Sequence, residues 1–142
     1  MEKSNKEIIR DNIDDVNEWL DKKVEKAKTV IEQFMSGNHL VDFATIESLS
    51  DEWQDIAEGV AVRVLNRAKG RLLLQCIMQK GALLLIHAHP DYEETFRVKT
   101  GVLLDKESDR VIDPKNPKTF PLKQYHTIFA IQKTDMEIDC IQ

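Results

Sequence analysis

The sequence predicts an α+β protein in which a helical N-terminal segment precedes a mainly antiparallel β-barrel. Two patterns along the 142 residues indicate this. Apolar residues recur every three or four positions near the N-terminus, and they alternate with a period of two from Val60 onward. No helical pattern interrupts the alternating part, which favours antiparallel strands over a parallel sheet with crossover helices. We therefore expect a helical segment over residues 1–57 and a β-domain over residues 58–142.

The helical prediction depends on one apolar stripe between residues 5 and 36. Its members are Ile9, Ile13, Val16, Leu20, Val24, Ala27, Ile31 and Phe34. Gly37 follows the stripe as a predicted C-cap. Some 30 helical residues would extend roughly 45 Å at about 1.5 Å per residue, which is longer than a small domain is wide. The segment is therefore expected to pack on its own domain as two helices, or to form an arm that pairs with a second copy.

Short alternating runs predict seven or eight strands after Gly59. They lie at 60–65, 72–79, 82–89, 95–101, 110–113, 125–132 and 136–142. Turn-forming clusters separate them, and this spacing is typical of a β-barrel or sandwich. Residues 38–57 are expected to form a connector with a short helix capped by Ser50.

Composition narrows the class of protein. With 42% hydrophobic and 32% charged residues, the chain fits one soluble domain. It has no run of the roughly 20 apolar residues that cross a bilayer, and its charged N-terminus does not resemble a signal peptide. We therefore expect a cytoplasmic protein with no membrane partner. Cys76 and Cys140 show no CxxC spacing and are expected to be buried free thiols.

The net charge of −5 is distributed unevenly along the chain. Residues 1–57 contain seven Lys and Arg against fourteen Asp and Glu, whereas residues 58–142 contain thirteen against eleven. This balance leaves no strong patch for a polyanion, so we expect no nucleic-acid partner.

Three histidines and a glutamate share the parity of apolar residues on the predicted strands. His87 and His89 lie two positions apart and therefore project to the same side of a strand. Glu94 and His126 also have inward parity. The apolar residues that define these inward faces are Leu83, Leu85, Phe96, Val98, Ile128 and Ala130. Each unsatisfied polar group in an apolar interior costs roughly 1–3 kcal/mol, and a divalent cation would satisfy the imidazoles and the carboxylate together. For an isolated His-x-His pair, histidines without a metal are the alternative.

The region around these residues resembles the first motif of the cupin superfamily. That motif reads Gly, five residues, His-x-His, three or four residues, Glu, six residues, Gly. Its positions are filled here by Gly81, His87, His89, Glu94 and Gly101. The resemblance covers about residues 58–142 and implies a small β-barrel.

The second cupin motif, Pro-x-Gly-x-x-His followed by Asn after three residues, is matched in part. Pro121 and His126 are in register, but Lys123 stands at the internal Gly and Ala130 at the Asn. Lys115 stands where a Gly is expected six residues before the Pro. The missing glycines imply a different turn at residues 113–120.

The resemblance implies a site in which His87, His89, Glu94 and His126 hold one divalent metal ion. Such mixed ligands suit Fe, Mn, Ni, Zn or Cu, and the sequence does not choose among them. An octahedral ion would keep two positions for water, substrate or O₂, and Glu94 could leave the metal to act as a catalytic base. The apolar inward face favours a small, mostly apolar organic molecule as ligand.

Cupins have many activities, so the resemblance leaves open whether the chain is an enzyme. The leading hypothesis is a metal-dependent cupin that acts as a dioxygenase or isomerase. The alternative is a non-catalytic cupin that senses a ligand or binds a protein, with the helical segment as a dimerisation arm. The resemblance also implies a homodimer, because unpaired strand edges tend to be covered or paired.

Overall fold

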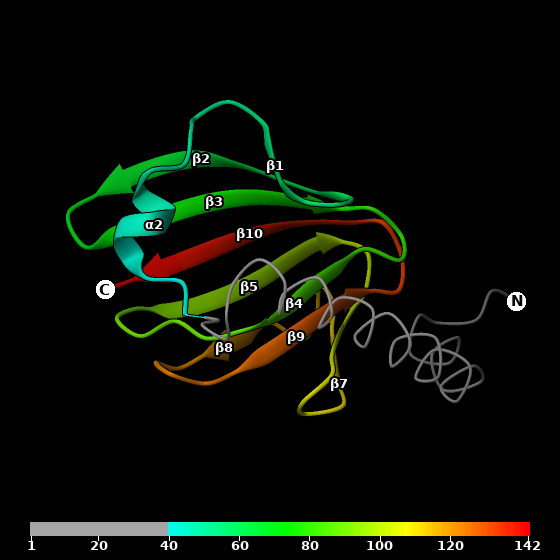
Figure 1. Ribbon diagram of the computed structural model, residues 1–142. Coiled ribbons are helices and arrows are strands. Elements are labelled where there is room, and N and C mark those ends of the chain that lie inside the picture. The colour runs from blue at the N-terminus through cyan, green and yellow to red at the C-terminus, as the bar shows by residue number, and fades with distance from the viewer. Residues whose placement is uncertain (1–39) are drawn as a thin grey trace, which may run out of the picture. The chain divides into compact units, whose positions relative to one another are not determined.

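Two antiparallel β-sheets share one apolar core in the computed structural model, which describes residues 40–142 (Figure 1). The six-stranded sheet contains, in spatial order, β1 (Gln54–Ala57), β2 (Val60–Ala68), β3 (Arg71–Met78), β10 (Thr134–Ile141), β5 (Glu93–Thr100) and β8 (Lys118–Phe120). The four-stranded sheet contains β4 (Leu83–His87), β9 (His126–Ala130), β6 (Leu103–Asp105) and β7 (Arg110–Ile112). The helix α2 (Phe43–Glu47) precedes the first strand.

The predicted period-two alternation identifies the residues that form the core. The buried residues of β2 and β3 are Val60, Val62, Val64, Leu72, Leu74, Cys76 and Met78. From the other sheet, Leu103, Ile112, Ile128 and Ala130 belong to the same core cluster. The two sheets therefore bury their apolar faces against each other, as the alternation predicted.

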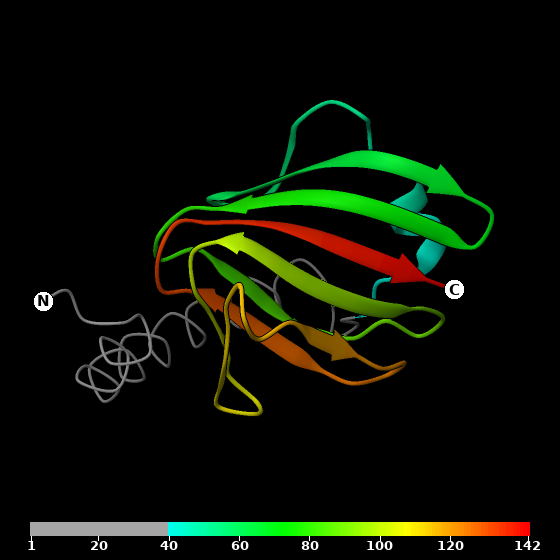
Figure 2. The same ribbon diagram turned by 180° about the vertical axis from the view of Figure 1, so that it is seen from behind.

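The last strand of the chain lies in the middle of the large sheet. β10 runs antiparallel between β3 and β5, as both views of the molecule show (Figures 1 and 2). It pairs along its whole length with β3, from Thr134 opposite Met78 to Ile141 opposite Arg71. The large sheet therefore depends on residues that are far apart in the sequence.

The mainly antiparallel β-structure is confirmed, but the closed barrel is not. Within residues 40–142 the strands form two separate sheets, and no strand pairing joins the edges of one to the edges of the other. β6, β7 and β8 have only three residues each, so they offer too few backbone groups to close a continuous ring.

The predicted helical stripe over residues 5–36 lies outside the described residues. Within the connector, the predicted helix after Ser50 is wrong. The helix lies earlier, where the Asp42 side chain accepts hydrogen bonds from the Thr45 backbone N–H (2.9 Å) and hydroxyl (2.6 Å). Residues after Ser50 instead form β1, because hydrogen bonds to β2 outweigh local helix preference. Among residues 40–142, no helix has the length or apolar character that crossing a membrane requires.

A bulge in β4 changes which residues share the inner face. Leu84 lies opposite Ile128 and His87 lies opposite His126, so three steps along β4 match two steps along β9. Leu84 packs against the core cluster, whereas Leu83 lies opposite Phe129. Leu83 is buried as predicted, but it does not share a face with His87, because the bulge shifts the strand by one residue.

Two turns form without the glycines of the cupin motif. The Asp113 carboxylate accepts hydrogen bonds from the Lys115 backbone N–H (3.0 Å) and the Asn116 side chain (2.7 Å), which closes the turn before β8. Lys123 takes a left-handed conformation with φ of 66°, although it has a side chain. Its N–H donates to the His89 carbonyl at 2.8 Å, so this turn supports a predicted site residue.

Candidate metal centre

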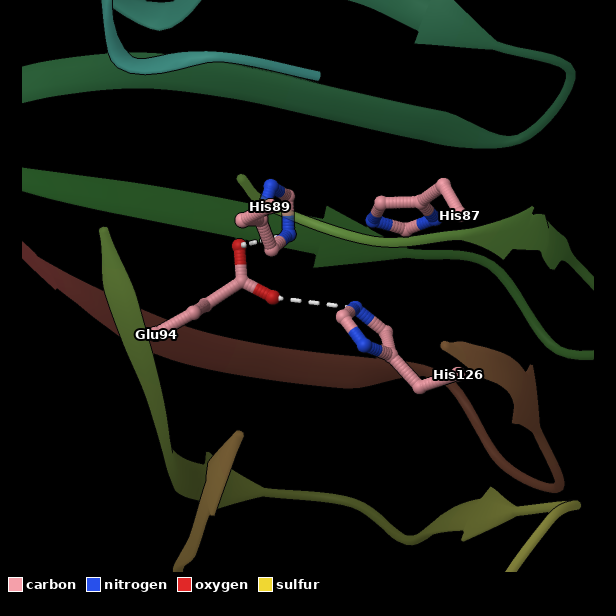
Figure 3. A group of neighbouring side chains, drawn as sticks. All are labelled: His87, His89, Glu94 and His126. Carbon is pink, nitrogen blue, oxygen red and sulfur yellow. Dashed lines mark ion pairs between the residues drawn. The ribbon is translucent and has the colours of Figure 1, made fainter. Parts of the chain in front are cut away.

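The four residues predicted as metal ligands lie together inside the sandwich (Figure 3). His87 ends β4, His89 follows two residues later, Glu94 lies in β5 and His126 begins β9. One ligand atom from each residue lies within 4.8 Å of the others. Both sheets therefore contribute to one cluster.

Glu94 lies between two imidazoles. Its Oε2 atom is 3.2 Å from His89 Nε2, and its Oε1 atom is 3.3 Å from His126 Nε2 (Figure 3). The ring of His87 completes the group, with its centroid 4.4 Å from that of His126 and 4.8 Å from that of His89. His89, Glu94 and His126 are buried, and His87 is half-buried.

Backbone carbonyls fix the tautomer of all three histidines. The Nδ1 atom lies 2.7 Å from the Leu85 carbonyl in His87, 3.0 Å from the Val41 carbonyl in His89 and 3.1 Å from the Gln124 carbonyl in His126. A carbonyl oxygen only accepts, so each Nδ1 must carry the proton. In the neutral form of each ring the lone pair is then on Nε2, which is the arrangement of a metal-binding histidine with a hydrogen-bonded second nitrogen.

Three polar atoms of this cluster are buried without a hydrogen bond of acceptable geometry: His89 Nε2, His126 Nε2 and Glu94 Oε1. Unpaired buried polar atoms are costly and uncommon in native proteins. All three belong to side chains that converge on one another, and all can donate an electron pair to a cation. The donor set therefore fits a divalent metal ion.

The charge state of the cluster also suits a cation. Burial alone would raise the pKa of Glu94, but the adjacent imidazoles of His126 and His89 hold it well below its usual range. Burial lowers the pKa of His87 to about 4, so this imidazole is neutral at pH 7. Burial alone would lower the pKa of His89, but the Glu94 carboxylate raises it. The ionised Glu94 carboxylate and the neutral His87 imidazole are ready to bind a metal, whereas a metal would have to displace a proton from protonated His89.

Aromatic rings surround the histidines. Phe120 stacks on His126 with ring centroids 4.1 Å apart and an interplanar angle of 26°. Tyr92 lies against His89 at 4.3 Å, and Phe96 lies 6.4 Å from His126. Tyr92 is fully buried, and its hydroxyl has no hydrogen-bond partner among residues 40–142. The potential ligand atoms therefore lie in an apolar setting, with the Tyr92 hydroxyl nearby.

Sequence reasoning missed two contributors to the site. The Val41 carbonyl holds His89, and a backbone carbonyl has no signature in the sequence. Phe120 was missed because β8 is only three residues long, which is too short for alternation to show. The Pro that follows it was the only available signal, since it belongs to the partly matched second motif.

By sequence, the chain matches no protein-family model and no curated protein. Its structure, however, is similar to solved cupin structures. KdgF from Halomonas sp. has a TM-score of 0.58 at 16% identity, and the match covers 64% of this chain and 86% of that one. An RmlC-like cupin from Shewanella frigidimarina has a TM-score of 0.56 at 20% identity, covering 67% of this chain and 84% of that one. The cupin domain of Schizosaccharomyces pombe Cnp3 has a TM-score of 0.56 at 12% identity, covering 68% and 71%.

These similarities show that the described residues have the cupin fold, which confirms the resemblance drawn from the motif residues. Together, these findings describe a chain with the cupin fold and a potential metal site of three histidines and one glutamate.

Proposed function

We propose that the chain binds one divalent metal ion through His87, His89, Glu94 and His126. The observation that supports this most strongly is the convergence of three buried ligand atoms without a hydrogen bond, one from Glu94 and two from His89 and His126, whose Nδ1 atoms bond to backbone carbonyls. Nitrogen and carboxylate ligands in this ratio suit Fe, Mn, Ni, Zn or Cu.

We further propose that the site acts on a small, mostly apolar organic molecule in a dioxygenase or isomerase reaction. A bound divalent ion would supply Lewis acidity to a substrate oxygen or, with a redox-active metal, activation of O₂. Phe96, Phe120 and Tyr92 would exclude water from that position, and their rings favour an apolar substrate.

Glu94 has two proposed roles, as metal ligand and as catalytic base. Its low pKa supports the ligand role, because a carboxylate stabilised by two histidines is a weak proton acceptor. It would become a stronger base only after separating from His89 and His126. Replacing Glu94 by Gln keeps the shape of the side chain but removes its charge. Measuring both the metal content and the turnover of this variant distinguishes the ligand role from the role as a base.

The test of metal binding is elemental analysis of the untagged full chain after equilibration with each candidate ion. We expect about one ion per chain in the wild type and almost none in the His87→Ala/His89→Ala double variant. His39→Ala is the matched control, since it removes the one histidine outside the cluster. Metal that stays with the double variant would show that the ion binds elsewhere.

The alternative function, a non-catalytic cupin that binds a ligand or protein, is favoured by the exposed edge of β1. Trp53 is 42% and Ile56 is 47% exposed, and within residues 40–142 β1 pairs with a strand on one side only. An open edge with apolar side chains suits a second copy of this chain, so we propose a homodimer here. The role of residues 1–57 as a dimerisation arm stays a prediction.

Light scattering tests the homodimer. We expect a dimeric mass for the wild type and a monomeric mass for Ile56→Lys, with Leu65→Lys on β2 as a control of similar exposure, 41%. A monomeric wild type at micromolar concentration would contradict the homodimer. A dimer that binds no divalent ion would favour the non-catalytic function.

A further inference from the structure

The segment Leu40–Phe43, here called the strap, lies beside the proposed metal site formed by His87, His89, Glu94 and His126. Leu40 forms a parallel bridge with Ala88, and the Val41 N–H donates to the Ala88 carbonyl at 3.0 Å. The Val41 carbonyl in turn accepts the hydrogen bond from His89 Nδ1. The strap is therefore paired with the stretch of chain that carries His87 and His89.

His89 differs from the other two histidines in what orients its ring. His87 and His126 each bond to a carbonyl two residues earlier in their own segments, those of Leu85 and Gln124. His89 bonds to a carbonyl 48 positions away in sequence. The first two rings are thus set by local backbone, whereas the orientation of His89 requires the strap to be docked.

Two further contacts hold the strap in place. The Phe43 N–H donates to Asp91 Oδ1 at 2.8 Å, which ties the start of α2 to the loop after His89. The Phe43 ring meets Tyr92 edge to face at 5.8 Å, and Tyr92 itself lies against His89. The strap therefore contacts His89 directly through the Val41 carbonyl and indirectly through the Phe43 and Tyr92 rings.

We propose that the strap is a positioning element for the metal centre, so that strap docking and metal binding are thermodynamically linked. This inference rests on the proposed metal binding by the four-residue cluster. With the strap docked, the Val41 carbonyl keeps the proton on Nδ1 and aims Nε2 at the metal. With the strap displaced, His89 loses its orienting partner. Loss of such an outer hydrogen bond typically weakens metal affinity about 10- to 100-fold.

Linkage requires the effect to be reciprocal. If docking of the strap tightens metal binding, then metal binding must hold the strap more firmly by the same factor. Residues 1–39 are joined to the described residues at Leu40, the first residue of the strap.

The test compares Zn²⁺ affinity in three full-length proteins, measured by competition with a chromophoric chelator. Asp91→Ala removes the acceptor for the Phe43 N–H, and Asp91→Asn keeps an oxygen at that position but removes the charge. We expect Zn²⁺ to bind Asp91→Ala about tenfold more weakly than wild type and Asp91→Asn within about threefold of wild type. Equal weakening in both variants would mean that the charge, not the strap, matters, and would overturn the proposal.

Hydrogen exchange gives a second readout without any substitution. Zn²⁺ should slow exchange at the Val41 and Phe43 amides, both of which donate hydrogen bonds that dock the strap. The Gln79 amide, bonded to the Gly59 carbonyl in the β1–β2 region, serves as the internal control, and the strap amides should slow by a larger factor than this amide. If wild type binds no Zn²⁺, the proposed function fails. If it binds Zn²⁺ while strap exchange and the affinity of Asp91→Ala are unchanged, only the strap proposal fails.

Discussion

Asp139 shows how a single residue organises the outer face of the large sheet. Its carboxylate is almost fully buried and accepts hydrogen bonds from Arg71 at 2.8 and 3.1 Å and from Arg97 at 3.2 Å. The nearby Glu137 is paired with Lys99 at 3.0 Å. Asp139 thus joins residues from three neighbouring strands, β3, β10 and β5. The hydrogen bond from Arg71 lowers its pKa below the ordinary value, with a further contribution from Arg97.

This lowered pKa predicts a pH-dependent contribution to stability. Because the folded pKa lies below the unfolded value near 3.8, the carboxylate stabilises the fold above that pH and loses this contribution as pH falls through the folded pKa. We therefore expect Asp139→Asn to destabilise the protein at pH 7 and pH 5, with a smaller deficit at pH 3. Urea unfolding followed by circular dichroism at the three pH values measures this. Parallel profiles for the two proteins would contradict it.

Lys123 is a residue under backbone strain beside the metal cluster. Its positive φ costs a non-glycine residue about 1–2 kcal/mol, and glycine would remove that cost while losing about 0.4–1 kcal/mol through the unfolded state. We expect Lys123→Gly to raise the free energy of unfolding by about 0.5 kcal/mol, and Lys123→Val to lower it by about 1 kcal/mol or more. Equilibrium denaturation of both variants checks this prediction. A destabilised Gly variant would mean that the Lys side chain itself stabilises the turn.

At the scale of elements, the turn between β5 and β6 requires glycine. Gly101 has a φ of 106°, and a Cβ there would lie 2.5 Å from Thr134 Oγ1 and 2.6 Å from Thr134 Cα, and against the Lys133 carbonyl. Backbone atoms cannot move aside cheaply. Gly101 is also the last position of the first cupin motif, so this motif residue has a steric explanation.

We expect Gly101→Ala to lower the free energy of unfolding by about 3 kcal/mol or more, because both strain and overlap oppose it. Gly70→Ala is the matched control. Gly70 also has a positive φ, 68°, but its nearest neighbour would be Gln142 Cβ at 3.8 Å, so we expect a loss of only about 1–2 kcal/mol. Chemical denaturation of both variants provides the comparison, and similar losses would show that overlap contributes little.

The strands that the sequence predicted are those long enough to show alternation. β2, β3, β4, β5, β7, β9 and β10 each fall within or close to a predicted run, and the inward parity of Glu94 and His126 is confirmed by their burial. β6 and β8 were not predicted, and with three residues each they offer little alternation to recognise. β1 was missed because only pairing with β2 favours a strand there. The bulge in β4 left no trace in the apolar pattern.

The four residues of the site could be found from the sequence because their spacing and parity are local properties. What surrounds them depends on long-range contacts. The Val41 carbonyl reaches His89 from 48 residues away, and the Asp91 carboxylate receives the Phe43 N–H over the same separation. Such contacts follow from the folded path of the chain, which residue types alone do not encode.

At the scale of the whole molecule, the cluster of His87, His89, Glu94 and His126 connects the two sheets. Glu94 comes from the six-stranded sheet, and His87 and His126 come from the four-stranded sheet. An ion bound to all of them would hold the sheets together, and since the cluster forms only in the folded chain, the ion should bind the native state alone.

Metal should therefore stabilise the whole fold. At a free metal concentration of 100 times Kd, we expect the free energy of unfolding to rise by about 2.7 kcal/mol. His126→Ala should show no such increase, and wild type in excess chelator gives the baseline. Thermal and chemical unfolding with and without Zn²⁺ measure the effect. An equal gain in His126→Ala would place the stabilising ion at another site.

The central place of β10 also affects how the chain is made. β3 and β5 lie on either side of a strand that is synthesised only at residues 134–141. During synthesis, the edges of β3 and β5 that pair with β10 stay unpaired, and their apolar faces stay uncovered, until residues 134–141 emerge from the exit tunnel. β1, β2 and β3 can pair in sequence order, but the large sheet is completed only when β10 joins β3 to β5, which is a late step. The nascent chain, rather than the finished protein, is thus the form most exposed to aggregation and most in need of a chaperone.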